Sequence, residues 1–202
     1  VRDHGRSMSG LWAEVGITPE MALSNRLAVE WTEGDEVTLD GRPVAPEGQV
    51  RWSAADDDGG LFIVDTERTT VVLGPTAGRT IELAGVRFEV GQTSNGYAAI
   101  ALTSMDGLPL DESRRMLLVA MNRVENQEMG WDEGRTTVGR AWGNGPAIAE
   151  GVPVTVTLAG REGLSAWALD VEGRRGEAVP MQGGALAVGP RDRTVWYEIA
   201  TQ

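Results

Sequence analysis

The chain has 202 residues, a formal net charge of −12 and 41% hydrophobic residues, values that indicate a globular protein of one domain. It contains no cysteine and one histidine, His4, and all 18 of its basic residues are arginine. These counts exclude disulfides, zinc ribbons, histidine-based triads, Schiff-base chemistry and P-loop nucleotide sites, and the surplus of negative charge argues against nucleic-acid or membrane partners.

The first 25 residues are the least strand-like part of the chain. Within them Thr18–Leu23 has a capping residue, a proline at the first helical position and an acidic residue in the first turn, which predicts a short helix. We therefore expect residues 1–25 to form a linker or N-terminal arm. Because the start lacks the apolar core of a signal peptide, we expect the chain to be a piece of a longer protein.

The remainder, residues 26–202, is dominated by hydrophobic period two. Residues 27–31, 86–90 and 152–158 alternate between apolar and polar side chains, as strands with one buried face do. Residues 61–64, 97–102 and 116–120 are apolar on both faces, which is typical of strands inside a sandwich or under a neighbouring layer. With Gly-rich turns between them, these strands predict an all-β fold, an antiparallel β-sandwich or jelly roll with a short N-terminal arm and helix.

Two acidic groupings are candidates for a metal site or for catalysis. The run Asp56–Asp58 lacks the ligand spacing of a calcium loop and falls between the predicted strands Val50–Ser53 and Leu61–Asp65, so a polar hairpin turn is favoured. No metal site is predicted, although a structural calcium ion held by backbone carbonyls stays open. Glu125 and Glu128 lie near a tryptophan and could be the paired carboxylates of a glycosidase, but a solvated loop is the favoured interpretation.

The chain has seven tryptophans against two phenylalanines and two tyrosines. Trp31, Trp52 and Trp167 share strand parity with core residues and are predicted to be buried. Trp196 has the opposite parity to Tyr197, so we expect it on the other face of its strand.

Three aromatic residues stand in turn-rich segments, where a ligand could reach them. Trp131 and Trp142 are flanked by glycines and polar residues, and Tyr97 follows the turn dipeptide Asn95-Gly96. Exposed aromatic rings can stack on the flat C–H faces of sugars. The alternative is that each ring fills a space between a loop and the sheet.

Six segments occur in an order known from one group of domains. They are Leu61–Thr69, Leu102–Gly107, Arg115–Leu118, Arg123–Asn126, Trp142–Pro146 and Val195–Ile199. Together they resemble the β-sandwich domains that follow the catalytic barrel of bacterial glycoside hydrolases, whose pattern f-x-V-x-T-P-R-T matches the first segment. The departure is Glu67, which stands where the pattern has proline. The similarity extends from about Leu27 to Ile199.

The resemblance implies an extracellular, non-catalytic domain of a larger secreted enzyme, covalently linked to a glycoside hydrolase catalytic domain. We expect a carbohydrate-binding module for a polysaccharide or oligosaccharide of the plant-type β-glycan class, with no cofactor and no catalytic residue. Trp131, Trp142 and Tyr97 would stack on the sugar rings, and Asn126, Arg123 and Glu128 would bond to hydroxyls. The alternative is a structural domain that packs on the catalytic barrel without binding glycan, with Trp196 and the doubly apolar strands facing the barrel.

Overall fold

The computed structural model describes residues 16–17, 25–31, 37–43, 48–53, 60–83 and 85–201, and for 25–31, 37–43 and 52–53 it describes the backbone alone. The helix predicted at Thr18–Leu23 and the acidic run Asp56–Asp58 lie outside these residues. In the part of the chain that is described, no helix is long and apolar enough to cross a membrane.

The described elements are sixteen strands and one short 3-10 helix. They are β1 (Asn25–Trp31), β2 (Val37–Pro43), β3 (Val50–Ser53), β4 (Leu61–Asp65), β5 (Thr69–Gly74), β6 (Thr80–Leu83), β7 (Val86–Val90), β8 (Ala98–Ser104), β9 (Arg115–Gln127), β10 (Asn144–Gly151), β11 (Val154–Leu158), β12 (Leu164–Leu169), β13 (Arg175–Val179), β14 (Met181–Gln182), β15 (Ala185–Val188), η1 (Pro190–Asp192) and β16 (Trp196–Thr201).

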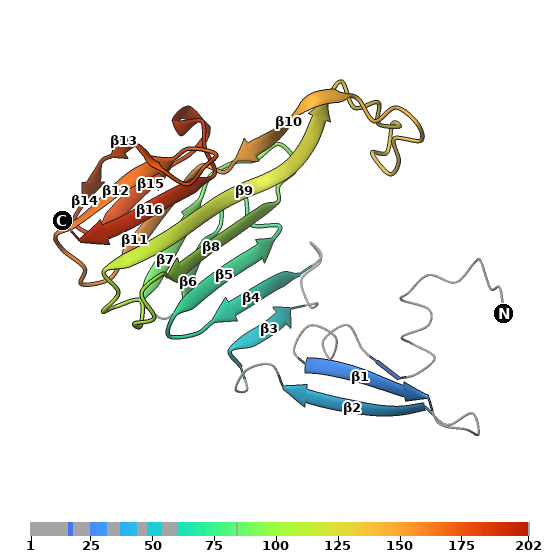
Figure 1. Ribbon diagram of the computed structural model, residues 1–202, viewed down its shortest axis with the longest axis horizontal. Coiled ribbons are helices and arrows are strands. Elements are labelled where there is room, and N and C mark those ends of the chain that lie inside the picture. The colour runs from blue at the N-terminus through green and yellow to red at the C-terminus, as the bar shows by residue number, and fades with distance from the viewer. Residues whose placement is uncertain are drawn as a thin grey trace.

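The strands form a large sheet, a small sheet and a separate hairpin (Figure 1). The large sheet has the order β13-β12-β16-β9-β8-β5-β4-β3, with β10 paired to β9, and the small sheet has the order β14-β15-β11-β7-β6. The hairpin consists of β1 and β2. Each pairing is antiparallel, so the prediction of an all-β antiparallel fold is confirmed for the described residues.

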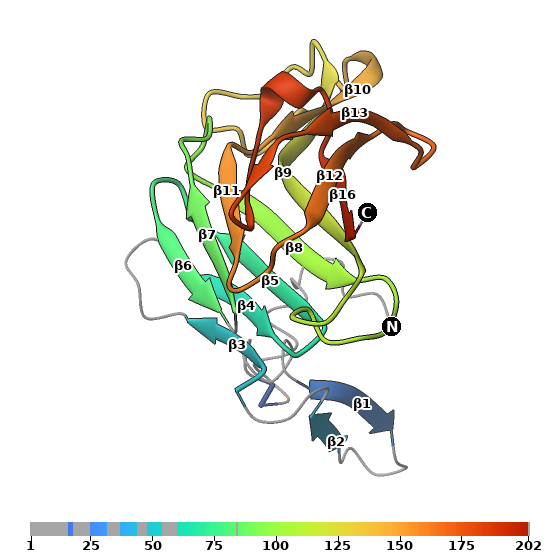
Figure 2. The same cartoon turned by 90° about the vertical axis from the view of Figure 1, so that its left-hand side faces the viewer.

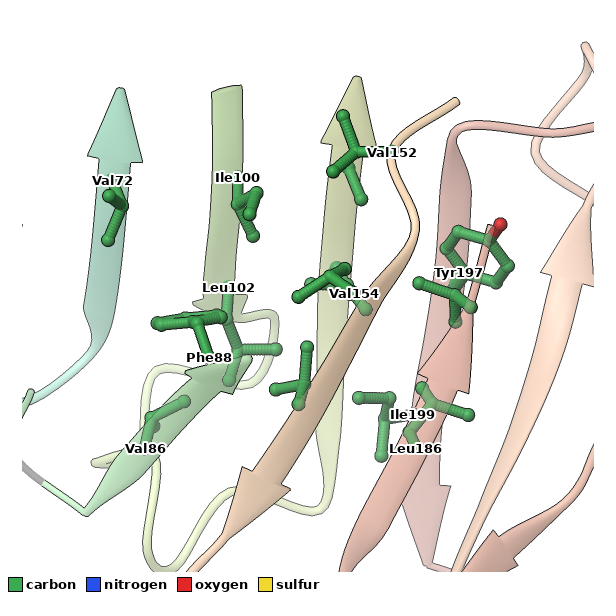
Figure 3. Packing of buried hydrophobic residues seen from close by; sticks show 14 of the residues in the cluster. Val72, Val86, Phe88, Ile100, Leu102, Val152, Val154, Leu186, Tyr197 and Ile199 are labelled. Carbon is green, nitrogen blue, oxygen red and sulfur yellow. The ribbon is translucent and has the colours of Figure 1, made fainter. Parts of the chain in front are cut away.

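The two main sheets face each other as separate layers, with β6, β7 and β11 on one side and β4, β5 and β8 on the other (Figure 2). Alternate residues of both layers meet in one hydrophobic core. Full burial of an aliphatic or aromatic side chain contributes about 1.5–3 kcal/mol, so this core is the main source of stability. Figure 3 shows Ile100, Leu102, Tyr197 and Ile199 of the large sheet with Phe88, Val154 and Leu186 of the small one.

Among the described side chains, the alternation in the sequence corresponds to the faces of the strands with one exception, and the side chains of Trp31 and Trp52 lie outside that set. Trp167 was predicted to be buried, but it is only half-buried and faces outward, because Ala166 and Ala168 occupy the inward positions of β12 at 1% and 8% exposure. The Cζ of Arg175 lies 3.9 Å from the centroid of its ring. The prediction for Trp196 is confirmed, since it is 41% exposed on the outer side while Tyr197 is buried.

Strand β9 is the longest element, with thirteen residues, and it extends past the rest of the large sheet. After exposed Arg115, its first half alternates between buried and half-buried residues, and its second half has no fully buried residue. That second half pairs with β10, so the two strands project as a hairpin (Figure 1). The hairpin and its connecting loop therefore stand outside the shared core.

Candidate functional site

A cleft of about 520 Å³ lies against the β9–β10 hairpin, and we name it the hairpin cleft. This volume is within the range of small-ligand sites, roughly 300–1,000 Å³. The cleft is open to solvent, and ten of its eleven lining residues come from the hairpin and its loop. The lining residues are Ser94, Arg123, Glu125, Asn126, Gln127, Glu128, Met129, Trp131, Arg135, Ile148 and Glu150.

The register of the hairpin determines which side chains reach the cleft. Ile148 is paired with Glu125, and paired residues of antiparallel strands point to the same side. Glu150 follows two residues after Ile148 and lines the cleft beside Arg123. Ala149, between them, points to the opposite side, because successive strand residues alternate.

The loop between β9 and β10 is stabilised by hydrogen bonds between its own residues. The backbone N–H of Gly130 donates to the carbonyl of Ala141 at 2.8 Å. The Asp132 carboxylate accepts hydrogen bonds at 2.6 Å from both the backbone N–H and the hydroxyl of Thr136. Gly143 has φ of 73°, and a Cβ there would overlap the carbonyl oxygen of Gln127. The loop closes on the end of β9 only because this position is glycine.

Glu125 is the centre of the charged groups in the cleft. It accepts hydrogen bonds from Arg135 at 2.5 Å and from the indole N–H of Trp131 at 3.0 Å, and Nε of Arg123 lies 3.2 Å from its Oε1. The hydrogen bond from Arg135, with that from Trp131 and the charges of both arginines, holds the pKa of Glu125 below its usual value. Glu125 is therefore an ionised acceptor at neutral pH.

Glu150 joins the hairpin to the turn before β8. It accepts hydrogen bonds from the backbone N–H and the hydroxyl of Ser94, at 3.1 and 2.7 Å, and from the amide of Asn122 at 3.1 Å. Nε of Arg123 lies 3.2 Å from its Oε2. Burial raises the pKa of Glu150, but the bonds from Ser94 and the charge of Arg123 outweigh burial, so its pKa is lowered.

The Trp131 ring is fixed at two points while it lines the cleft. Its N–H donates to Glu125, and the Cζ of Arg135 lies 4.9 Å from the ring centroid, a cation–π contact. The side chain is half-buried. A ring held in one orientation loses less conformational entropy when a ligand packs on it.

The structure brings four of the six predicted binding residues to the cleft: Trp131, Arg123, Asn126 and Glu128. Trp142 and Tyr97 are exposed, at 62% and 42%, but neither lines the cleft.

Two of the four residues at the cleft also hold the loop. The Asn126 amide donates to the carbonyl of Trp142 at 2.9 Å, and the Glu128 carboxylate accepts from the amide of Asn144 at 3.1 Å. Their polar groups are therefore partly engaged before any ligand binds.

Sequence reasoning missed the contributions of Ser94, Arg135, Ile148 and Glu150 to the cleft. The loop of sixteen residues between the two strands conceals their register, which also shifts at two irregularities in β10. In β10, Ile148 and Glu150 alternate with alanines. This alternation is the one feature of the sequence that indicates a strand whose two faces differ.

A second surface is the outer face of the large sheet, which Figure 1 shows towards the viewer. Two rows of paired, outward-facing apolar residues lie on it, one from β4 to β9 and the other from β3 to β16. We name it the apolar face, and its residues are Phe62, Leu73, Ala99 and Met121 in one row and Val50, Val64, Val71, Ala101, Val119 and Trp196 in the other. Apart from exposed Trp196, they are half-buried.

The apolar face has an area of a few hundred Å². Its two rows are each about 7 Å wide and span three and five strand spacings of about 4.8 Å, which gives roughly 270 Å². Contiguous apolar patches of this size or larger often mark contact sites. At β16 the face adjoins a groove of about 680 Å³ that is lined by Trp196, Leu169, Val171, Ala147 and Ala149, among others.

The next row on the same sheet is mixed, because Thr69, Thr103 and Glu198 stand in it with Leu117 and Trp167. Thr69 and Thr103 share a hydrogen bond of 2.7 Å, and Glu198 accepts from Arg115 at 3.0 Å and from Arg175 at 2.7 Å. The hydrogen bond from Arg175, reinforced by Arg115, keeps the pKa of Glu198 below its ordinary value. This row borders the apolar face with paired charges.

Among the residues that the structure describes, no group of three or more His, Asp or Glu side chains is placed to hold a metal ion. No protein-family model, no curated protein and no solved structure matches the chain. The function of the chain must therefore be inferred from the two surfaces and from the resemblance in the sequence.

Proposed function

We propose that the chain is a non-catalytic carbohydrate-binding domain of a secreted polysaccharide-degrading enzyme and that it binds a plant-type β-glycan in the hairpin cleft. The observation that carries the proposal is the cleft itself, which joins the oriented ring of Trp131 to ionised carboxylates and arginines. The resemblance to domains of bacterial glycoside hydrolases supplies the rest of the proposal: jelly-roll connectivity, an extracellular location and a covalently linked catalytic domain.

The residue types of the cleft suit a sugar. An indole ring offers an apolar surface for the C–H face of a pyranose, and carboxylate oxygens accept hydrogen bonds from hydroxyls. Glu125 and Glu150 remain ionised, so they can accept from several donors at once. Ile148, 55% exposed, adds apolar surface to the same cleft.

The charge states of Glu125 and Glu150 suit hydrogen-bond acceptors rather than the proton donor of a glycosidase. A glycosidase needs a carboxylic acid whose pKa is raised, so that it can give a proton to the leaving oxygen. The pKa values of Glu125 and Glu150 shift in the opposite direction, because hydrogen bonds and arginine charges stabilise their ionised forms.

Affinity electrophoresis and calorimetry against glucans, xylans and mannans test the proposal. Trp131→Ala should weaken binding at least tenfold, since truncating a central aromatic residue commonly costs 2 kcal/mol or more. Trp196→Ala, a change of the same size outside the cleft, is the control and should leave affinity unchanged. Trp142→Ala and Tyr97→Ala report whether those exposed rings touch the glycan. An intact domain that binds none of these polysaccharides contradicts the proposal.

A second candidate function is favoured by the apolar face. In this alternative the chain is a structural domain that packs on a glycoside hydrolase catalytic domain through the apolar face and binds no glycan. The supporting observation is that ten outward positions across six strands carry apolar side chains, including Trp196. Covering such a face with a second apolar surface is favourable, because it removes apolar area from water.

The triple variant Val71→Thr/Ala101→Ser/Val119→Thr tests this alternative by making the centre of the apolar face polar. Sedimentation of the chain mixed with glycoside hydrolase catalytic domains should show a complex that the triple variant weakens and Thr155→Ser, on the small sheet, does not. Equal association by the wild-type chain and the triple variant would exclude the apolar face as the contact surface.

A further inference from the structure

The hairpin cleft contains both signs of charge, and its positive charges are neutralised within it. Its lining has two arginines and three glutamates. Nε of Arg123 lies 3.2 Å from a carboxylate oxygen of Glu125 and 3.2 Å from one of Glu150. Arg135 is bound to Glu125 and also stacks on Trp131. No arginine of the cleft lacks a carboxylate partner within the cleft.

This pairing bears on which sugars can bind. Proteins commonly bind a carboxylate through an arginine fork, in which two N–H groups donate to the two oxygens. In the cleft the arginines are already paired with glutamates, whose lowered pKa values keep them charged. A uronate would have to compete with those glutamates and would meet a surplus of negative charge in a chain of net charge −12.

We infer that the hairpin cleft selects uncharged glycans and rejects polysaccharides that carry uronic acids, an inference that rests on the proposed function. Hydroxyl groups avoid the conflict, because they can donate to the carboxylates without displacing the arginines. The carboxylates thus have two roles. They accept hydrogen bonds from the sugar hydroxyls, and they neutralise the arginines that would otherwise attract acidic glycans.

The chain contains a matched arrangement for the control. On the outer face of the small sheet, Arg87 lies 3.4 Å from Glu82 and 3.1 Å from Glu89, so one arginine again stands between two glutamates. Glu82→Gln/Glu89→Gln changes the net charge as much as Glu125→Gln/Glu150→Gln does. Glu82, Arg87 and Glu89 do not line the hairpin cleft.

The experiment compares mannan, glucan and a xylan without uronic-acid side groups with polygalacturonate and alginate in affinity gels at low and high salt. The wild-type chain should bind at least one neutral polysaccharide and bind the two polyuronates at least tenfold more weakly. Glu125→Gln/Glu150→Gln should gain salt-sensitive polyuronate binding, and Glu82→Gln/Glu89→Gln should not. Circular dichroism checks that both variants are folded, and Glu150→Gln alone serves if the double variant is not.

The outcomes separate the inference from the function. A wild-type chain that binds polyuronates as tightly as neutral glycans overturns the inference and leaves carbohydrate binding in place. If the two double variants gained polyuronate binding equally, the effect would come from net charge rather than from the cleft, and this result would also overturn the inference. Binding to no polysaccharide at all contradicts the proposed function, and the inference with it.

Discussion

The outer faces of the two sheets are built on the same period-two pattern but differ in chemistry. On the small sheet the outward residues are mostly polar: Thr80, Glu82, Arg87, Glu89, Thr155 and Thr157, followed by Ala185 and Ala187 on β15. On the large sheet the two rows of the apolar face contain no polar residue. The small sheet has the pattern expected of a surface in water, and the large sheet has the pattern of a surface that something covers.

This difference explains why three strands looked uniformly apolar in the sequence. In β4, β8 and β9 one set of residues enters the core, and the other set forms the apolar face. Only the inner set is covered by the small sheet, so the two sets are apolar for different reasons. The predictions below test that distinction, from the largest expected effect to the smallest.

The largest effect should distinguish the two faces of a single strand. Leu118 is fully buried and Val119, next to it on β9, is half-buried on the apolar face. Leu118→Ala should lower the free energy of unfolding by about 2–5 kcal/mol. Val119→Thr should lower it by less than about 1 kcal/mol. Urea unfolding followed by tryptophan fluorescence measures both. Equal losses would mean that the apolar face is covered within the chain.

The next effect concerns the charged border of the apolar face. Glu198 is buried and bound by two arginines, so Glu198→Ala should cost about 1–3 kcal/mol by leaving both without their partner. Glu89→Ala, at an exposed pair on the small sheet, should change stability by less than about 0.5 kcal/mol. The prediction fails if the two substitutions cost the same.

Stability should also fall in acid. The pKa values of Glu198, Glu125 and Glu150 are lower in the folded chain than their ordinary value of 4.5. The resulting stabilisation is complete above the unfolded pKa and is lost as pH falls through the folded values. The free energy of unfolding should be level from pH 8 to 6 and decline below about 4.5. Glu198→Gln should reduce the decline, and a variant with the same profile as the wild type would contradict this.

The smallest effect should come from the small sheet. Thr155 faces outward on β11 between Glu89 and Ala187. Thr155→Val should change the free energy of unfolding by less than about 0.5 kcal/mol, because one more apolar group on a polar surface neither fills nor opens a space. Binding of an apolar dye should be unchanged by this substitution, whereas Val71→Thr should decrease it. Equal dye binding by the two variants would remove the contrast between the faces.

Much of the fold was predictable, because period two is a local property. The strands predicted at Val50–Ser53, Leu61–Asp65 and Val86–Val90 have the same bounds in the structure. The position of Trp196 was predicted correctly from its parity with Tyr197, because Tyr197 lies in the core and adjacent strand residues point to opposite faces. Parity failed for Trp167, because in β12 the residues that enter the core are small alanines and the large residues face outward.

The candidate site was predictable only in part. Trp131, Arg123, Asn126 and Glu128 are close in sequence, so their arrival at one cleft follows from a single hairpin. Glu150 and Ser94 reach the same cleft from β10 and from the turn before β8, which are joined by hydrogen bonds between residues 56 positions apart. Pairings over that distance depend on the assembled sheet rather than on any local pattern.

By itself the sequence determined the class of fold, several of the strands and the chemistries that its composition excludes, because composition and alternation act residue by residue. The tertiary structure decided which apolar face is core and which lies outside, since both have the same period and only the position of the small sheet separates them. It also decided that Glu125, Glu150 and two arginines neutralise one another, because ion pairs form between groups that the chain brings together from several elements.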